Sequence, residues 1–197
     1  NNGGGQFPAA AEAIRSKGWN AVIDTNLTGT FFCCQAAFVE GGMRENGGVI
    51  VNMIANHFNG FPGMIHTGAA RAGVDAVTKT LATEWAEFGV RVNAVAPGVI
   101  YSTTAEGNYA NEAKHGQNAF ENHLTSNAPK IPFRRLGSVE EVSSVVTFLL
   151  SDAAAYVSGS TYRVDGALSL SQPTWDIKPT VRPVREAFPV FGNLPEV

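Results

Sequence analysis

The 197-residue sequence has no basic run, no long apolar segment and almost no cysteine. Its fourteen Lys and Arg are scattered among seventeen Asp and Glu, so we expect no nucleic-acid partner. No apolar run reaches the roughly 18 residues that a spanning helix needs, so we predict no membrane span. The only cysteines, Cys33 and Cys34, are adjacent within a helical pattern. That spacing suits neither a disulfide framework nor a metal site, and we predict that they pack in the core.

A Gly-rich nucleotide-binding turn is also missing. A dinucleotide-binding domain begins with a strand, a Gly-rich turn and a helix whose N–H groups hold the pyrophosphate. The sequence opens instead with NNGGGQFP, which does not lead into a helical pattern. We therefore expect the chain to be the C-terminal part of such a domain, with the missing turn in roughly a hundred preceding residues.

Helical and strand patterns alternate along the rest of the chain. Helices are expected over Trp19 to Arg44, Gly68 to Phe88 and, after a capping box at Ser138 to Glu141, through Leu150. Strands are expected over Val49 to Ala55, Val90 to Ala96 and Gly159 to Gly166. This alternation implies helical crossovers, so the predicted fold class is α/β, a doubly wound parallel sheet.

The predicted organisation is one domain over residues 1–170 and an extended tail over 171–197. The tail contains five prolines and cannot hold a long helix. Residues from Val99 to about Gly137 show weak periodicity, which indicates a long loop, and such loops are usually functional lids.

Several short motifs occur in the order found in the short-chain dehydrogenase/reductase family, which the sequence resembles. They are NNGG from Asn1, NLTGTF from Asn26, APG from Ala96, EEVSSVVTFLLSDAAAYVSG from Glu140 and VDG from Val164. The resemblance extends from Asn1 to about Ser169 and implies a Rossmann-like fold and a nicotinamide cofactor, NADPH. Together, NNGGGQF, HTGAARAGV and APGVIYS most resemble peroxisomal trans-2-enoyl-CoA reductases, and then dienoyl-CoA reductases.

The departure from the family pattern concerns its catalytic helix. Most members carry Tyr-x-x-x-Lys before Ala-Gly-Val, and here Thr67 and Arg71 stand at those places. Ketone reduction needs an acid near neutral pKa, which Thr67 cannot supply. Reduction of a C=C bond conjugated to a thioester needs donors for an enolate oxygen instead. The missing acid therefore favours reduction of a trans-2-enoyl-CoA, although an inactive enzyme would show the same absence.

The resemblance implies catalytic roles for Asn26, Thr67 and Arg71, with Asp75 as a minor candidate. Arg71 takes the place of the residue that holds the nicotinamide ribose. A surface ion pair between Arg71 and Asp75 is an equally good interpretation of their spacing. For Asn26, the alternative is a solvent-facing residue near a bend at Gly29.

Cofactor contacts are expected from two segments besides Arg71. The first contains Asn2, Gly3 and Gly4, and the second contains Pro97, Gly98, Ile100 and Ser102, with Thr103 as an alternative to Ser102. A plain strand-ending turn would also explain Pro97-Gly98. The family's serine after the fifth strand has no counterpart, and Asn56 or His57 is a possible substitute. Asp165-Gly166 and Gly159 are interpreted as strand entry and exit.

Other functions and partners stay open at this stage. A dienoyl-CoA reductase, a 3-oxoacyl reductase whose acid is Tyr101 or Tyr109, and a catalytically silent cofactor-binding protein are the alternatives. The expected partners are an acyl-CoA thioester and further copies of the chain, with the helices from Trp19 and Gly68 as the interface. The resemblance implies a peroxisomal location, although no C-terminal Ser-Lys-Leu signal is seen; otherwise we expect the cytosol.

Overall fold

The computed structural model describes residues 1–102, 126–171 and 176–178. The chain divides into two compact units. The first contains Asn1–Ala96 and Val145–Tyr162, and the second contains Pro97–Ser144 and Arg163–Val197.

The sheet forms from runs of β-branched residues, which fit a strand covered on both faces. Strand β1 (Gly48–Met53) pairs in parallel with β2 (Val90–Pro97), with Ile50 opposite Val92, and β3 (Thr161–Val164) follows β2 in the order β1-β2-β3. The predicted parallel α/β architecture is thus confirmed. Strand β1 ends two residues before the predicted Ala55, and β3 is shorter than predicted.

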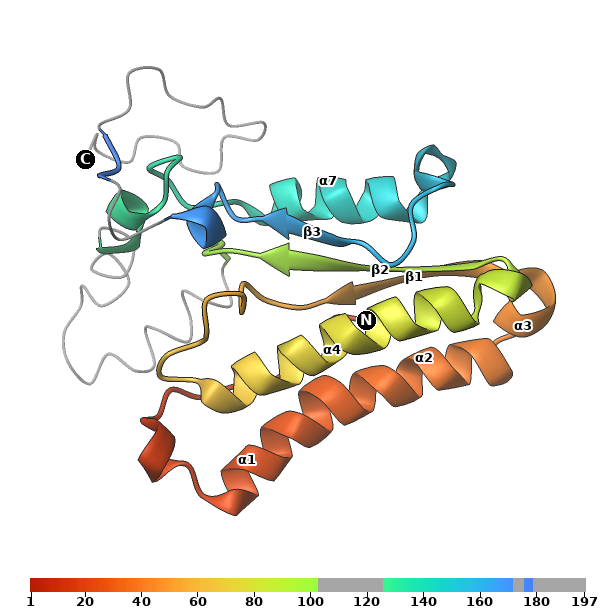
Figure 1. Ribbon diagram of the computed structural model, residues 1–197, viewed down its shortest axis with the longest axis horizontal. Helices are drawn as coiled ribbons and strands as arrows, with labels where there is room; N and C mark the ends of the chain where they lie inside the picture. The colour runs from red at the N-terminus through yellow and green to blue at the C-terminus, as the bar shows by residue number, and fades with distance from the viewer. Residues whose placement is uncertain (103–125, 172–175, 179–197) are drawn as a thin grey trace. The chain divides into compact units, whose positions relative to one another are not determined.

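In the first unit, helices α2 (Gly29–Val39) and α4 (Ile65–Glu84) lie side by side along the paired strands (Figure 1). Trp85, just after α4, stacks on Phe38 of α2 with ring centroids 4.2 Å apart. Cys34 joins the same buried cluster, as predicted, whereas Cys33 is exposed. Such packing fixes α4 on the strands that position its N-terminal residues.

The helix predicted over Trp19 to Arg44 is confirmed as far as Val39, but it contains a π-helical turn and ends earlier than predicted. The segment contains α1 (Ser16–Ile23), a π-helical turn (Asp24–Thr28), α2 and the short α3 (Met43–Asn46). In the π-helical turn the Gly29 N–H donates to the Asp24 carbonyl, five residues back. Single π turns within helices often occur at functional sites.

Helix α4 begins three residues before the predicted Gly68 and runs for 20 residues, followed by a 3-10 turn (Ala86–Phe88). Gly89 then adopts a left-handed conformation, φ +68°, as expected of the residue that ends a helix. The early start places His66 and Thr67 inside the first turn. Among the described residues, no helix has the combined length and apolarity required to cross a membrane.

Helix α7 (Val139–Leu150) begins with the predicted capping box. The Glu141 N–H donates to Ser138 Oγ at 3.3 Å, and the Ser138 N–H donates to Glu141 Oε2 at 3.0 Å. Short 3-10 turns lie at Ala11–Ala13, Ala128–Lys130, Asp152–Ala154 and Leu168–Leu170.

Candidate active site

The N-terminal segment lies along the outer edge of β1. The Asn1 backbone nitrogen donates to the Val51 carbonyl at 2.8 Å, and the Met53 N–H donates to the Asn1 carbonyl at 2.9 Å. Inside, Asn1 Nδ2 donates to Asn52 Oδ1, and Asn52 Nδ2 donates to Thr78 Oγ1 on α4. This buried network connects the N-terminal segment, β1 and α4. It fixes the position of Asn1 and hence of the first glycine that follows it.

Asn26 is fully buried in the π-helical turn. Its Oδ1 accepts the Gly5 N–H at 2.8 Å, and its Nδ2 donates to the Gly5 carbonyl at 3.0 Å. The Thr30 hydroxyl donates to the Asn26 carbonyl at 2.9 Å. The solvent-facing alternative for Asn26 is therefore wrong. Its side chain holds the glycine segment.

Arg71 points to the same glycine segment from α4. Its Nη1 donates to the Met53 carbonyl at 2.8 Å, and a Cβ on Gly4 would collide with its guanidinium. Burial lowers the pKa of Arg71, which still stays protonated at physiological pH. The structure thus brings together Gly4, Asn26 and Arg71, three of the predicted site residues.

The Arg71 guanidinium has unused donors. Its Nη2 and Nε groups donate to no residue in the described part of the chain. Gly4 allows the backbone of the glycine segment to approach the guanidinium closely, where a Cβ would clash with Nη2. A charged group with free N–H donors beside a glycine fits the predicted contact with ribose hydroxyls.

Thr67 is fully buried at the start of α4. Its Oγ1 has no hydrogen-bond partner within the described ranges. Its backbone N–H donates to Nδ1 of the neighbouring, equally buried His66 at 2.9 Å. A buried hydroxyl without a partner is costly and unusual in folded proteins, which suggests that its acceptor is a ligand.

Asp75 is bonded to residues outside the glycine segment. Its Oδ2 accepts from Lys79 Nζ at 2.5 Å, and its Oδ1 accepts from the Thr161 hydroxyl on β3. No described ion pair joins it to Arg71, so the predicted Arg71–Asp75 pair is wrong. Burial alone would raise the pKa of Asp75, but the bonds from Lys79 and Thr161 outweigh it and hold the pKa below its usual value of 3.8.

We expect Asp75→Asn to change the pH dependence of stability more than the activity. Because the pKa of Asp75 is lowered by folding, its carboxylate stabilises the fold above about pH 4, and this contribution is lost as pH falls through the folded-state pKa. The Tm difference between the wild type and the variant should therefore shrink below about pH 4. A large fall in kcat at unchanged Tm would favour the catalytic role instead.

The second predicted cofactor segment belongs to the second unit. The Gly98 N–H donates to the Val164 carbonyl at 2.9 Å, and a Cβ on Gly98 would come within 2.7 Å of Asp165. Ile100 forms a β-bridge with Gly137. Pro97 precedes this close approach and Ser102 follows the bridge. These contacts confirm a turn at the end of β2. The cofactor role of Pro97, Gly98, Ile100 and Ser102 stays a prediction.

Asp165 and Gly166 have the predicted strand-exit role. Asp165 Oδ1 accepts the Ala167 N–H, and its Oδ2 accepts the Ser169 N–H, while Gly166 is left-handed at φ +58°. Gly159, with φ +69°, forms the turn before β3.

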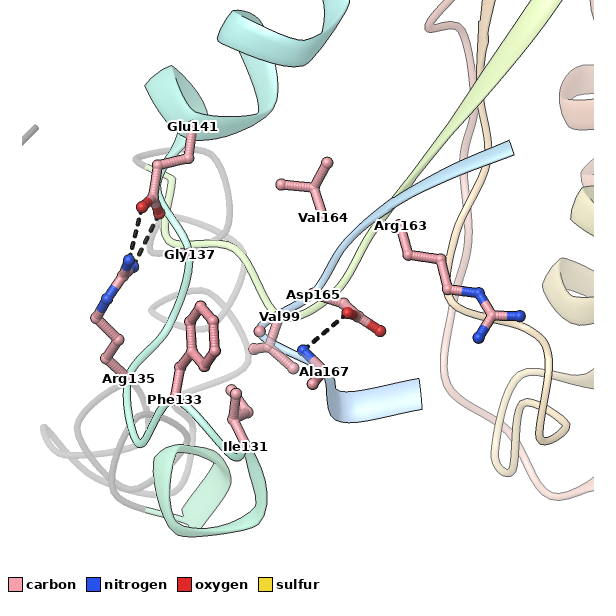
Figure 2. Close-up of a pocket in the computed structure, with 11 residues that line it drawn as sticks. Val99, Ile131, Phe133, Arg135, Gly137, Glu141, Arg163, Val164, Asp165 and Ala167 are labelled. Carbon is pink, nitrogen blue, oxygen red and sulfur yellow. Dashed lines mark hydrogen bonds and ion pairs between the residues drawn. The ribbon is translucent and has the colours of Figure 1, made fainter. Parts of the chain in front are cut away.

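A cavity of about 310 Å³ lies in the second unit. Figure 2 shows Arg135 and Glu141 directed toward each other on one wall, with Asp165 bonded to Ala167 on another. The Arg135 guanidinium makes two bonds to the carboxylate, at 2.6 and 2.8 Å, and lowers the pKa of Glu141. The other lining residues are Val99, Ile131, Phe133, Gly137, Arg163, Val164 and Gly166. Arg135 and Glu141 on this wall of the cavity therefore neutralise each other.

The remaining candidates are only partly placed. Asn56 and His57 follow β1, and their substitute role stays a prediction. The Tyr101 N–H donates to the Gly137 carbonyl, whereas Thr103 and Tyr109 lie outside the described residues. Within the described ranges, His, Cys, Asp and Glu side chains form no group suited to a metal ion.

Two residues were missed by the sequence reasoning. Gly5 supplies both backbone groups that Asn26 binds, and His66 is fully buried directly before Thr67. The only available signal for His66 was its place before the residue that stands in for the acid. A lone histidine among apolar neighbours gives no other signal.

Residues 1–169 match the protein-family model described as Enoyl-(Acyl carrier protein) reductase. The probable 2,4-dienoyl-CoA reductase, (2E)-enoyl-CoA-producing, of Bacillus subtilis (strain 168) is 40% identical over 168 residues, which are 84% of this chain and 63% of the relative. The peroxisomal 2,4-dienoyl-CoA reductase, (3E)-enoyl-CoA-producing, of Arabidopsis thaliana is 34% identical over 196 residues, 95% of this chain and 63% of the relative. The chain thus spans less than two thirds of these relatives.

Solved structures share the fold. The citronellol catabolism dehydrogenase AtuB of Pseudomonas aeruginosa PAO1 is 42% identical, with a TM-score of 0.67 over 86% of this chain and 60% of its own. A gluconate 5-dehydrogenase from Burkholderia cenocepacia J2315, in complex with NADP and tartrate, is 27% identical, with a TM-score of 0.73 over 86% and 63%. The predicted Rossmann-like, doubly wound fold class is confirmed.

Proposed function

Because the chain belongs to the short-chain dehydrogenase/reductase family, we propose that the complete protein uses NADPH to reduce a C=C bond conjugated to an acyl-CoA thioester. One observation carries the proposal. The residue at the family's acid position is Thr67, a fully buried hydroxyl without a described partner, which can donate a hydrogen bond but cannot act as a near-neutral acid.

Reduction of an enoyl thioester does not require an acid that protonates the carbonyl oxygen. A bound reduced nicotinamide supplies the hydride, which is added at the β-carbon of the enoyl thioester. The C=C electron pair moves toward the thioester carbonyl, whose oxygen becomes an enolate, and a proton from water completes the α-carbon. Thr67 Oγ1 donates to that oxygen as its charge develops. A ketone would need a proton on oxygen itself.

The other first-unit residues act as holders. Arg71 directs its unused N–H groups to the ribose hydroxyls. The side-chain oxygen and nitrogen of Asn26 both hydrogen-bond to the Gly5 backbone, so Asn26 positions the segment Asn2 to Gly5. Its amide is therefore not a contact for the substrate. Pro97, Gly98, Ile100 and Ser102 remain the proposed contacts for the carboxamide end of the cofactor.

A dienoyl thioester is the second candidate substrate. The named activity of the Bacillus subtilis and Arabidopsis thaliana relatives favours it. A second conjugated C=C bond moves the point of hydride addition along the chain, but the charge still reaches the thioester oxygen. The same donors therefore serve both substrates.

Turnover by the complete protein tests the proposal. NADPH consumption should be measured with but-2-enoyl-CoA, hexa-2,4-dienoyl-CoA and acetoacetyl-CoA at equal concentrations. We expect either unsaturated thioester to react at least about tenfold faster than the ketone, since an acid contributes about a hundredfold or more to ketone reduction. Faster reduction of acetoacetyl-CoA would contradict the proposal. NADPH binding without turnover of any thioester would indicate the catalytically silent alternative.

Arg71→Met should weaken NADPH binding about tenfold to a hundredfold, because hydrogen bonds from a charged donor contribute roughly 1.5–3 kcal/mol. Arg71→Lys keeps the charge and should recover part of the affinity, though not the planar fork. Titration of cofactor fluorescence measures both without turnover. Equal affinity of the wild type and Arg71→Met would exclude the ribose contact.

We also propose a homo-oligomer that includes the helical layer of the first unit. Phe32 and Val39 on α2 are large and exposed, which is typical of a covered helix face. Size exclusion of the complete protein should give more than one copy. A peroxisomal location is supported by the Arabidopsis thaliana relative, and a cytosolic one stays open.

A further inference from the structure

Two consecutive, fully buried polar side chains begin α4. Besides Thr67 Oγ1, the Nε2 atom of His66 has no hydrogen-bond partner among the described residues. A buried N–H without an acceptor costs free energy on folding. The proposed roles of Asn26, Thr67 and Arg71 leave this imidazole unexplained.

The hydrogen-bond pattern fixes the form of His66. Its Nδ1 accepts the Thr67 backbone N–H at 2.9 Å, so Nδ1 carries no proton. In a neutral imidazole the proton is then on Nε2. His66 therefore presents a neutral Nε2–H donor. The imidazole is held by the hydrogen bond from the backbone N–H of Thr67, the residue at the family's acid position.

Phe7 packs against the imidazole from the N-terminal segment. The two rings are perpendicular, with centroids 4.5 Å apart. Phe7 lies two residues after Gly5, the partner of Asn26, so His66 contacts the segment that carries the predicted glycines. An aromatic ring is at best a weak acceptor for Nε2–H, which leaves the donor available to a stronger one.

Resting on the function proposed above, we propose that the Nε2–H of His66 is a second hydrogen-bond donor to the thioester oxygen, beside the Thr67 hydroxyl. Two donors suit an oxygen on which a full negative charge develops. No proton is transferred from His66 to the oxygen, and the α-carbon still receives its proton from water. His66 is then a catalytic residue, and its N–H donor is already held in place in the protein without substrate.

A pair of amide substitutions separates this role from simple packing. In His66→Asn, the side-chain oxygen can take the place of Nδ1 and accept the Thr67 N–H, but no donor remains at Nε2. In His66→Gln, the amide nitrogen takes the place of Nε2, and the acceptor for Thr67 is lost. Thr83→Ala, at an exposed position of α4, is the control.

We expect His66→Asn to lower kcat with but-2-enoyl-CoA about a hundredfold, because removal of one such donor costs roughly a hundredfold to a thousandfold. KM should change less than about threefold, since the charge develops only in the transition state. His66→Gln should stay within about tenfold of the wild type. The reverse order, or equal losses that follow Tm, would overturn the donor role and leave the proposed function standing.

A second measurement does not need turnover. In the ¹⁵N spectrum of the imidazole, saturated butyryl-CoA should shift the Nε2 resonance of His66 in the complete protein with NADP bound. Absence of this shift contradicts the inference, whether or not the enzyme is active. If no thioester is reduced but the resonance moves, the proposed function fails and the contact with a thioester oxygen stands.

Discussion

Thr67→Val is expected to stabilise the protein and nearly inactivate it. Valine has the shape of threonine without the hydroxyl, and in the structure that hydroxyl is buried and has no described partner. Its removal should therefore raise the free energy of unfolding by about 1 kcal/mol. The same change removes the proposed donor to the enolate oxygen, so kcat should fall about a hundredfold or more.

Thermal unfolding and steady-state kinetics on the complete protein check both halves of this expectation. Thr67→Ser is the matched control, because it keeps the hydroxyl and should keep most of kcat while it loses the stability that the methyl group provides. An unchanged kcat in Thr67→Val would remove the hydroxyl from the chemistry. A lower Tm in Thr67→Val would mean that the hydroxyl has a partner in the folded protein.

Asn26→Leu should lower both stability and activity. The Gly5 N–H and carbonyl lose their partners, although Gly5 is exposed and water can replace part of the bonding, so the expected cost is about 1–3 kcal/mol. Gly4 then no longer holds its place beside Arg71. Because a shift of about 1 Å can cost a hundredfold in rate, kcat/KM should fall about that much.

Asn26→Asp sharpens this test through pH. The carboxylate still accepts the Gly5 N–H but cannot donate to the Gly5 carbonyl. Protonation restores a donor, so the loss of kcat/KM in Asn26→Asp should become smaller as pH falls. Asn20→Ala, at an exposed position of α1, should match the wild type at each pH. A pH-independent loss in Asn26→Asp would contradict the role of Asn26 as a two-ended holder.

Local signals made part of the structure predictable. The capping box at Ser138 and Glu141 and the left-handed Gly89 each depend on residues within one turn of the chain, so their sequence is sufficient to predict them. The strands β1 and β2 were predictable because continuous β-branched runs suit a sheet covered on both faces. Their exact ends were not, because pairing partners decide them.

The site could be predicted only as a set of positions. The resemblance to the family pointed to Asn26, Thr67 and Arg71, but the contacts of Asn26 and Arg71 are with residues far away in the sequence: Gly5, Met53 and Gly4. The helical spacing of Arg71 and Asp75 suggested a pair, and the structure gives Asp75 to Lys79 and Thr161 instead. Helical spacing shows which side chains are near each other, whereas tertiary contacts decide which of them bond.

The π-helical turn has a consequence for insertions and deletions. A π turn holds more residues than an α-helical turn, and each residue of an α-helix rotates the chain by about 100°. Deletion of one residue between Asp24 and Thr28 would permit an unbroken α-helix, a backbone that is easier to form. Because the tighter α-helical turn offsets the lost residue, α1 and α2 would keep about the same relative rotation, but Asn26 inside the turn would be redirected away from Gly5. We expect a variant with such a deletion to fold at least as stably as the wild type and to lose cofactor binding. That result would show that the irregular helix is kept for the site and not for stability.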